Sequence, residues 1–298
     1  MFGVYFGKYL EDKGILTSEQ YNTIISDSKN ARVKLGLLAV ESGFMTVDQA
    51  DEVNMLQQMQ DRRFGDIAVE KGYLTDDQVG MLLKKQGDEY LLFVQALVEN
   101  NILTLEDIQR ELNCYKKSER FTALDVEAIK SGDIDKIVPV FTKNSDVSPM
   151  VKDYIALVAR NHVRFINTHF RIEKVEKMNE YTAPFVAAQE LEGDYHLFTG
   201  FCGDGDGLKE IAEAYAKEEF DTVDLDVLDA ACEFLNCNNG LYATKLSNED
   251  IEVDMLPPIM KDSMTTIHTE GNMYRVPFYI KDKKVDLIVC IESKWSLS

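Results

Sequence analysis

The chain has 298 residues, of which 45% are hydrophobic and 28% are charged, so we expect two folded domains of ordinary size. The formal net charge of −20 argues against nucleic acid as a partner, because affinity for that polyanion comes largely from the counterions that Lys and Arg displace. The longest apolar runs, such as Val285 to Ile291, are far shorter than the roughly 20 residues of a membrane helix, and the N-terminus lacks the pattern of a secretory signal. We therefore expect a cytoplasmic protein that does not span a membrane.

The cysteines and histidines show no spacing that is typical of a metal site. The five cysteines are odd in number and lack C-x-x-C pairs, which argues against both a disulfide framework and a zinc site; they are Cys114, Cys202, Cys232, Cys237 and Cys290. The histidines (His162, His169, His196 and His268) also form no metal pair. We expect free thiols, no metal and no cofactor of the chain's own.

The first half repeats with a period of 29 residues over four repeats. They begin near Tyr5, Lys34, Arg63 and Leu92. The third position holds Gly7, Gly36, Gly65 and Val94, the tenth holds Gly14, Gly43, Gly72 and Asn101, and the thirteenth holds Thr17, Thr46, Thr75 and Thr104. Three of the threonines precede a Gln by three residues, which is the spacing of a capping box at a helix start. Gly or Asn three residues before each Thr suits the left-handed turn that ends a helix. Each repeat is therefore predicted to be helix, tight turn, helix, in an all-helical repeat domain over residues 1–115.

Repeats two and three also resemble the MshE N-terminal domain, a cyclic di-GMP binding module of type II secretion ATPases. That family has two 24-residue motifs, RLGxxLxxxGxLxxxxLxxxLxxQ, with a five-residue spacer, which match Lys34 to Gln57 and Arg63 to Gln86 here. The resemblance implies that Lys34 and Arg63 contact phosphate or guanine, that Leu35 and Phe64 pack against the bases, and that Gln57 and Gln86 close each motif. Cyclic di-GMP would then be a ligand.

This sequence departs from that pattern at several positions. Lys34 stands where the family has an arginine, whose planar guanidinium binds in a two-pronged way that an ammonium does not reproduce. Several of the family's leucines are replaced, by Ala39, Ala50, Asn54, Ala68 and Val79. The alternative is a helical docking or dimerising module that keeps the scaffold without the ligand.

The second half has a mixed pattern that predicts an α+β domain over residues 149–298, after a partly helical linker at 116–148. Helical spacing appears at 151–167, 208–219 and 225–241, and strand-like runs at 182–189, 195–200, 275–280 and 284–292. Long helices between runs of strands favour helices packed on an antiparallel sheet.

Within the third of those helices lies the pattern Glu233-x-x-Asn236-x-x-x-Gly240, followed by Pro257-Pro258. This combination resembles the CheC/CheX chemotaxis phosphatases over essentially the whole of 149–298. The resemblance implies a phosphatase that hydrolyses the aspartyl phosphate of a CheY-like response regulator, and a homodimer. The partner receiver would supply the phosphoryl group, Mg²⁺ and a lysine.

Glu233 and Asn236 are the candidate catalytic residues. Side chains three apart on a helix project from one face, so the two can enter a partner's cleft together. By resemblance, Asn236 would position the attacking water and Glu233 would pair with the receiver's lysine. Asn161, on the first helix of this half, has no acid three residues before it, so one active site per chain is expected, and Asn238 and Asn239 should flank the face without chemistry. The alternative for Glu233 and Asn236 is an ordinary solvated helix face.

The resulting interpretation is a two-domain signalling protein with a helical docking or sensing module and a single-site response-regulator phosphatase. A non-enzymatic adaptor that binds phosphorylated receivers or cyclic di-GMP is the main alternative. A structural part of a flagellar or secretion assembly is the third.

Overall fold

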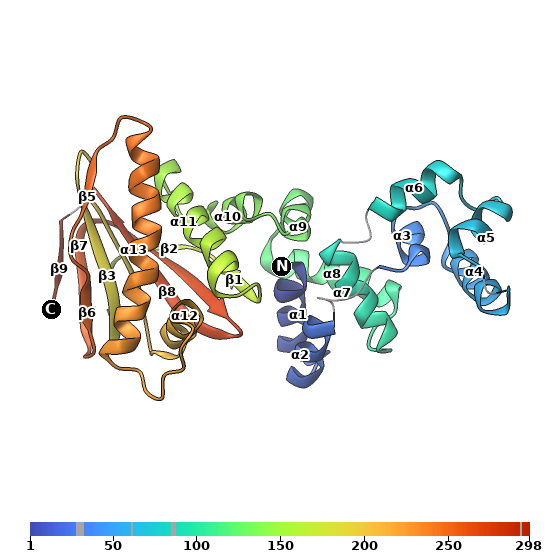
Figure 1. Ribbon diagram of the computed structural model, residues 1–298, viewed down its shortest axis with the longest axis horizontal. Helices are drawn as coiled ribbons and strands as arrows, with labels where there is room; N and C mark the ends of the chain where they lie inside the picture. The colour runs from blue at the N-terminus through green and yellow to red at the C-terminus, as the bar shows by residue number, and fades with distance from the viewer. Residues whose placement is uncertain (28–32, 61, 85–87, 293) are drawn as a thin grey trace. The chain divides into compact units, whose positions relative to one another are not determined.

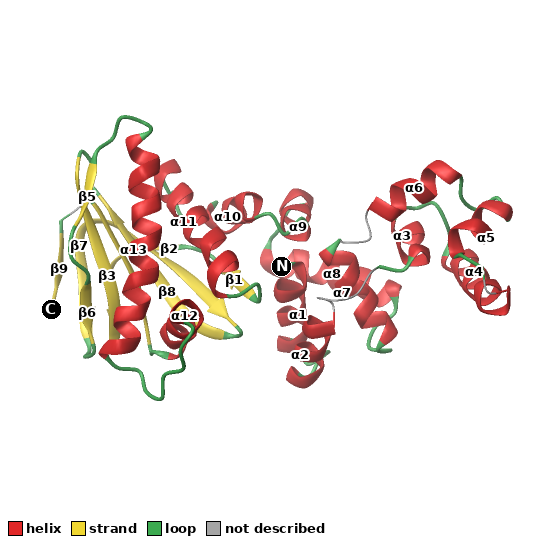
Figure 2. Ribbon diagram, viewed as in Figure 1, coloured by secondary structure: helices red, strands yellow, loops and turns green. Residues whose placement is uncertain are grey.

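The computed structural model describes residues 1–27, 33–60, 62–84, 88–292 and 294–298. The chain forms two compact parts, an N-terminal domain, Met1–Gly132, and a C-terminal domain, Asp133–Ser298. Figures 1 and 2 show helices throughout the first and a helix-covered sheet in the second. Among the described residues no helix is both long and apolar enough to cross a membrane.

The described part of the N-terminal domain is entirely helical, as predicted, with two helices in each repeat. The helices are α1 (Phe2–Asp12), α2 (Ser18–Asp27), α3 (Leu35–Glu41), α4 (Val47–Gln60), α5 (Phe64–Glu70), α6 (Asp76–Lys84), α7 (Glu89–Glu99), α8 (Leu105–Glu119) and α9 (Ala123–Lys130). The tenth positions adopt the predicted left-handed turn, with φ of +72°, +70° and +73° at Gly14, Gly43 and Gly72 and +54° at Asn101.

The three predicted capping boxes are present, and the fourth repeat has a capping box as well. In the second, the Thr46 amide donates to Gln49 Oε1 (2.9 Å) and the Gln49 amide donates to Thr46 Oγ1 (3.2 Å). The same reciprocal pair occurs between Thr17 and Gln20 and between Thr75 and Gln78. The fourth repeat uses Asp107 in place of Gln. The local prediction of helix, tight turn, helix is confirmed.

The repeats pair as one with four and two with three. An apolar residue at the second position packs on the third-position glycine of the other repeat, in both directions between repeats two and three and from repeat four onto repeat one, because repeat four has Val94 at its third position. A Cβ at Gly36 would lie 3.1 Å from Phe64 Cε2, one at Gly65 would lie 3.7 Å from Leu35 Cδ2, and one at Gly7 would lie 3.1 Å from Phe93 Cζ. The third-position glycines therefore allow the first helices of paired repeats to approach closely.

Residues 116–148, predicted to be a partly helical linker, are largely helical, and the division between the two compact parts falls within them, after Gly132. Helix α8 continues through Lys116 and Lys117 to Glu119 and ends at Arg120 in a left-handed conformation. Beyond it, α9 belongs to the N-terminal domain and α10 (Ile134–Thr142) to the C-terminal domain. Apolar side chains of both helices, such as Ile129 and Ile137, are fully buried. Each helix therefore contributes to the core of its own domain.

The C-terminal domain is the predicted α+β fold, with an antiparallel sheet. Its strands are β1 (Phe170–Ile172), β2 (Glu176–Ala183), β3 (Phe185–Gly193), β4 (Leu197–Gly203), β5 (Val253–Met255), β6 (Ile259–Lys261), β7 (Thr265–Ile280), β8 (Lys283–Ile291) and β9 (Trp295–Leu297). The order along the sheet is β1-β7-β8-β4-β3-β5, with β2 and β9 paired to β7 and β6 paired to β3. The helices are α10, α11 (Pro149–Asn161), the π-helix η1 (His162–Ile166), α12 (Asp206–Ala216) and α13 (Leu225–Ser247).

The two faces of the sheet are covered differently. Helices α12 and α13 pack on one face, with α11 beside α13 (Figure 1). The other face carries a second core around Val186, Phe198 and Ile288, onto which Tyr181 of β2 and Trp295 of β9 pack. The long strand β7 pairs with β9 in its first half and with β8 from Asn272 onward, and β2 pairs with it over both parts.

Candidate functional site

Helix α13 carries the two candidate catalytic residues across the sheet. It begins at Leu225, after Asp224 accepts hydrogen bonds from the Asp226 and Val227 amides. Its buried residues recur every three or four positions and face β3 and β4. The Glu233 side chain points away from these strands and is exposed, whereas Asn236, one turn later, is half-buried at the flank of the helix next to β3. The helix therefore presents a carboxylate and, beside it at its edge, an amide.

The Asn236 amide is held from below by Gln189 of β3. Gln189 Nε2 donates to Asn236 Oδ1 (3.0 Å) and to the Leu256 carbonyl oxygen (2.9 Å). Leu256 follows β5 and precedes Pro257 and Pro258, which have no N–H to give to the ladder. The chain leaves β3 there and rejoins it at β6. The proline pair thus places a backbone carbonyl within reach of the Gln189 amide.

Behind Gln189 lies a buried polar network that ends on α11. Asn239 Nδ2 donates to Gln189 Oε1 (2.9 Å) and to Thr199 Oγ1 (3.1 Å), and Tyr154 OH donates to Asn239 Oδ1 (2.6 Å). Asn239 and Thr199 are completely buried, and Gln189 is only 3% exposed. Buried polar groups need partners, and each member of this network has them.

Asn238 and Asn239, predicted to flank the candidate face, lie in the core instead. Asn238 is completely buried, accepts from Asn161 Nδ2 (2.9 Å) and donates to the Phe234 carbonyl oxygen (2.7 Å). Asn161 is therefore a structural residue that ties α11 to α13. That Asn238 and Asn239 take no part in chemistry stays a prediction; both side chains face the interior of the domain rather than the surface beside Glu233.

The rim of the candidate site includes residues that sequence reasoning missed. The Tyr215 ring, from α12, lies 5.3 Å from the Phe234 ring. Burial, a hydrogen bond with Cys237 and the charge of Glu233 raise the pKa of the Tyr215 phenol. On the other side, Met255 is 41% exposed and its methyl carbon would lie 3.7 Å from a Cβ at Gly240. Tyr215 and Met255 lie on the elements before and after α13, more than ten residues from Glu233 and Asn236, so the helical spacing within α13 could not indicate them.

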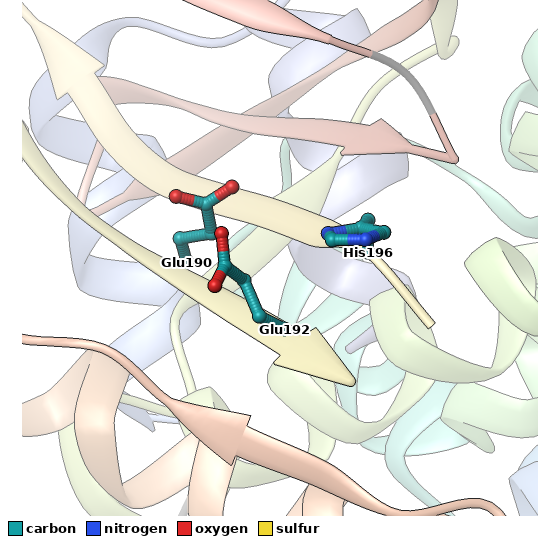
Figure 3. Close-up of side chains that lie close together, drawn as sticks. All are labelled: Glu190, Glu192 and His196. Carbon is teal, nitrogen blue, oxygen red and sulfur yellow. The ribbon is translucent and has the colours of Figure 1, made fainter. Parts of the chain in front are cut away.

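One group of potential metal ligands occurs in the part of the chain that the structure describes. Figure 3 shows Glu190, Glu192 and His196, whose ligand atoms lie within 4.8 Å of one another at the β3–β4 hairpin. Glu190 already accepts a hydrogen bond from Trp295 Nε1 (2.7 Å), and the other two side chains are exposed. Trp295 packs on the second core, so this group lies on the sheet face opposite α13.

The N-terminal candidates occupy equivalent places in repeats two and three. Lys34 and Arg63 are the N-cap residues of α3 and α5, and both are exposed. The Lys34 ammonium pairs with Glu99 Oε1 (2.6 Å). Leu35 and Phe64 lie at the contact between the two repeats described above, and Gln57 is exposed. Gln86 lies outside the described residues. A nucleotide site at these positions stays a prediction.

Comparison with known proteins places a family match within the C-terminal domain. Residues 185–281, about a third of the chain, match the family model described as chemotaxis phosphatase CheX. The matched segment begins at β3 and contains Gln189, Glu233, Asn236 and Leu256. No curated protein sequence matches the chain.

Several solved structures are similar to about half of the chain. The chemotaxis protein CheX from Desulfovibrio desulfuricans has 14% identity and a TM-score of 0.42, covering 49% of this chain and 100% of its own. A CheC-like superfamily protein from Shewanella sp. PV-4 has 17% identity and a TM-score of 0.42, covering 48% and 97%. The CheX–CheY–BeF3–Mg²⁺ complex from Borrelia burgdorferi has 16% identity and a TM-score of 0.36, again covering 48% and 97%. Within the C-terminal domain, residues 185–281 are thus similar to the chemotaxis phosphatase CheX family.

Proposed function

We propose that the C-terminal domain removes phosphate from the aspartyl phosphate of a CheY-like response regulator. One observation carries the proposal. Glu233 and Asn236 stand one turn apart on α13, Glu233 exposed and Asn236 half-buried where Gln189 anchors it, inside the segment that matches the chemotaxis phosphatase family. The match supports this class of reaction, and the geometry supplies two groups that can enter a partner's cleft together.

Each residue would have a distinct part in the reaction. Water attacks phosphorus, the bond from phosphorus to the aspartyl oxygen breaks, and inorganic phosphate and a free aspartate carboxylate result. An amide does not titrate in the working range, so Asn236 would hold the attacking water rather than take its proton. Glu233, an exposed carboxylate, would pair with the receiver's lysine and fix the docked pose. The receiver's Mg²⁺ would carry much of the phosphoryl charge, which suits a reaction whose catalysis is mostly positioning and electrostatics.

The test is the decay of acyl phosphate on a magnesium-loaded response regulator from the same source. The full chain should accelerate this decay, and the Asn236→Ala variant should not. Thr244→Ala is the matched control, because Thr244 is exposed two turns further along α13 and its hydroxyl donates to the Gly240 carbonyl oxygen of the same helix. No acceleration by the wild-type chain across the available regulators would favour the non-enzymatic adaptor. The predicted homodimer would be checked by its mass in solution in the same preparation.

We also propose, as a second function, that the N-terminal domain binds cyclic di-GMP and acts as its sensor. Its support is the reciprocal packing of repeats two and three, which places exposed Lys34 and Arg63 at equivalent positions, whereas the matching residues of the other pair, Tyr5 and Leu92, are buried. Titration of the full chain with cyclic di-GMP should show binding that Arg63→Ala removes and Arg110→Ala, an exposed arginine on α8, preserves. Absence of binding would leave a docking module.

A further inference from the structure

We propose that Gln189 is a positioning residue that turns the Asn236 amide so that its nitrogen, a hydrogen-bond donor, faces the docked partner. The inference rests on the proposed function, because it assigns the group that Asn236 presents to the phosphorylated receiver. The orientation of the Asn236 amide is inferred from the buried hydrogen-bond network alone and does not depend on the proposed function.

The direction of every amide in the network follows from one fixed acceptor. A backbone carbonyl oxygen can only accept, so the group of Gln189 that faces the Leu256 carbonyl at 2.9 Å must be the nitrogen. The other hydrogen of the same nitrogen points at Asn236, 3.0 Å away. Asn236 must therefore offer its oxygen to Gln189. The opposite corner of its planar amide, Nδ2 with two hydrogens, is directed away from β3.

The far end of the network obeys the same rule. With Nε2 facing Leu256 and Asn236, Gln189 presents Oε1 to Asn239, which must donate from Nδ2 at 2.9 Å. The remaining oxygen of Asn239 then accepts from Tyr154 OH at 2.6 Å. Each donor meets an acceptor in this arrangement. Turning Gln189 over would set its oxygen against the Leu256 carbonyl and the Asn236 oxygen and leave Asn239 Nδ2 facing a donor, so the buried network admits one direction.

The outward nitrogen decides what Asn236 can do. Among the described residues none accepts a hydrogen bond from Asn236 Nδ2, so both hydrogens are available to a ligand. Such a group donates to a lone pair of the attacking water or to a phosphoryl oxygen. Because Asn236 Oδ1 is tied to a residue that is 3% exposed, the donor is oriented before the partner docks, which is the arrangement that catalysis by positioning requires.

Two variants separate positioning from stability. Gln189→Met has a similar shape but cannot donate, so Asn236 is free to rotate. We expect turnover at saturating phosphorylated regulator to fall about tenfold, with little change in the half-saturating concentration. Tyr154→Phe breaks the same network at its far end and leaves the Leu256 and Asn236 contacts of Gln189 in place. It should lower the Tm yet keep turnover within about twofold of wild type. Equal losses of turnover in the two variants would overturn the proposal.

A second measurement needs neither activity nor a variant. In the wild-type chain with ¹⁵N-labelled asparagine and glutamine side chains, the amide hydrogens of Gln189 and Asn239 should exchange slowly with solvent and those of Asn236 quickly. Protected Asn236 hydrogens would mean that the nitrogen faces inward, and the proposal would be wrong. If the wild-type chain dephosphorylates no regulator, the proposed function fails, while the exchange pattern still decides the orientation of the amide.

Discussion

His162 stacks on Phe170, with ring centroids 4.8 Å apart and planes inclined by 27°. Phe201, Phe234 and Phe278 surround the same imidazole, which is completely buried. Neither ring nitrogen has a hydrogen-bond partner among the residues that the structure describes. Burial without a partner disfavours the charged form and lowers the pKa of His162 to about 3.

His162 should make the C-terminal domain less stable in mild acid. The unfolded chain binds a proton near the ordinary histidine pKa of about 6.5, whereas the folded domain binds it only near 3. Between these values the unfolded state holds more protons, so the free energy of unfolding falls as the pH drops below about 6.5, by up to about 1.4 kcal/mol per pH unit. The replacement His162→Phe should remove this slope and add about 1–2 kcal/mol at pH 7, because an unpaired polar group leaves the core.

The readout is urea unfolding at pH 7 and pH 5, followed by the fluorescence of Trp295, the single tryptophan of the chain. This residue reports on the C-terminal domain, where it packs on the second core. His196→Gln is the control, because His196 is exposed and its replacement should leave the slope unchanged. An undiminished slope in His162→Phe would assign the acid sensitivity to other groups.

The pairing of the repeats predicts opposite outcomes for two glycine-to-alanine changes. A Cβ at Gly7 would lie 2.8 Å from Tyr21 Cε2 and 3.1 Å from Phe93 Cζ, whereas one at Gly80, inside α6, would meet nothing within 4 Å. Gly7→Ala should destabilise the N-terminal domain by about 1–3 kcal/mol through overpacking. Gly80→Ala should stabilise it by up to about 1 kcal/mol, since alanine is the better helix former. Thermal unfolding followed by far-ultraviolet circular dichroism tests both, and equal shifts would contradict the close contact.

Arg275 lies between two carboxylates that should differ greatly in their contribution to stability. Arg275 Nε is 3.0 Å from Asp286 Oδ1 and Nη1 is 2.9 Å from Glu176 Oε2, and the two acid side chains are 5% and 55% exposed. The contact with Arg275 is an ion pair without hydrogen-bond geometry. Asp286 accepts a hydrogen bond from Tyr181 OH (2.7 Å), and its Oδ2 lies 3.3 Å from the Lys284 ammonium. Asp286→Ala removes the buried carboxylate that pairs with Arg275 and accepts from Tyr181, so it should lower the free energy of unfolding by about 3 kcal/mol. Glu176→Ala should cost less than about 1 kcal/mol. The same Trp295 fluorescence assay separates them, and similar costs would show that Asp286 is not paired in solution.

Local signals account for the parts of the fold that the sequence predicted well. Each Thr–Gln pair and each tenth-position glycine acts within a few residues, so the sequence predicted the turns of the repeats. The sequence did not predict that repeat one pairs with repeat four, because this pairing depends on a contact between Gly7 and Phe93, which are far apart in the chain. In the C-terminal domain the expected run at 182–189 is broken at Pro184, and β1, β5, β6 and β9 are each three residues long, too short for a periodic pattern.

The candidate site shows the same division between local and distant signals. Glu233 and Asn236 could be proposed from the sequence because a spacing of three residues brings two side chains to one side of a helix. Gln189 could not, because it contacts Asn236 across 47 residues of sequence. A glutamine beside Glu190 also looks like an ordinary polar position of a strand. The one indication that Gln189 is buried is its position in the alternating pattern of the strand. Ala187 and Leu191, two residues to either side, are fully buried, so Gln189 faces the core as they do.

The two residues on α13 should differ in which kinetic constant they control. If Asn236 only positions water, Asn236→Ala should lower turnover on the order of 100-fold or more while the affinity for the phosphorylated regulator stays nearly constant. If Glu233 pairs with a lysine of the partner, Glu233→Gln should raise the half-saturating concentration several-fold, keep most of the turnover, and weaken the dependence of affinity on salt, because one screened ion pair is lost. Turnover and half-saturation measured at two salt concentrations test both statements. A large loss of affinity in Asn236→Ala with turnover preserved would reverse the assignment, since the amide would then hold the partner rather than the water.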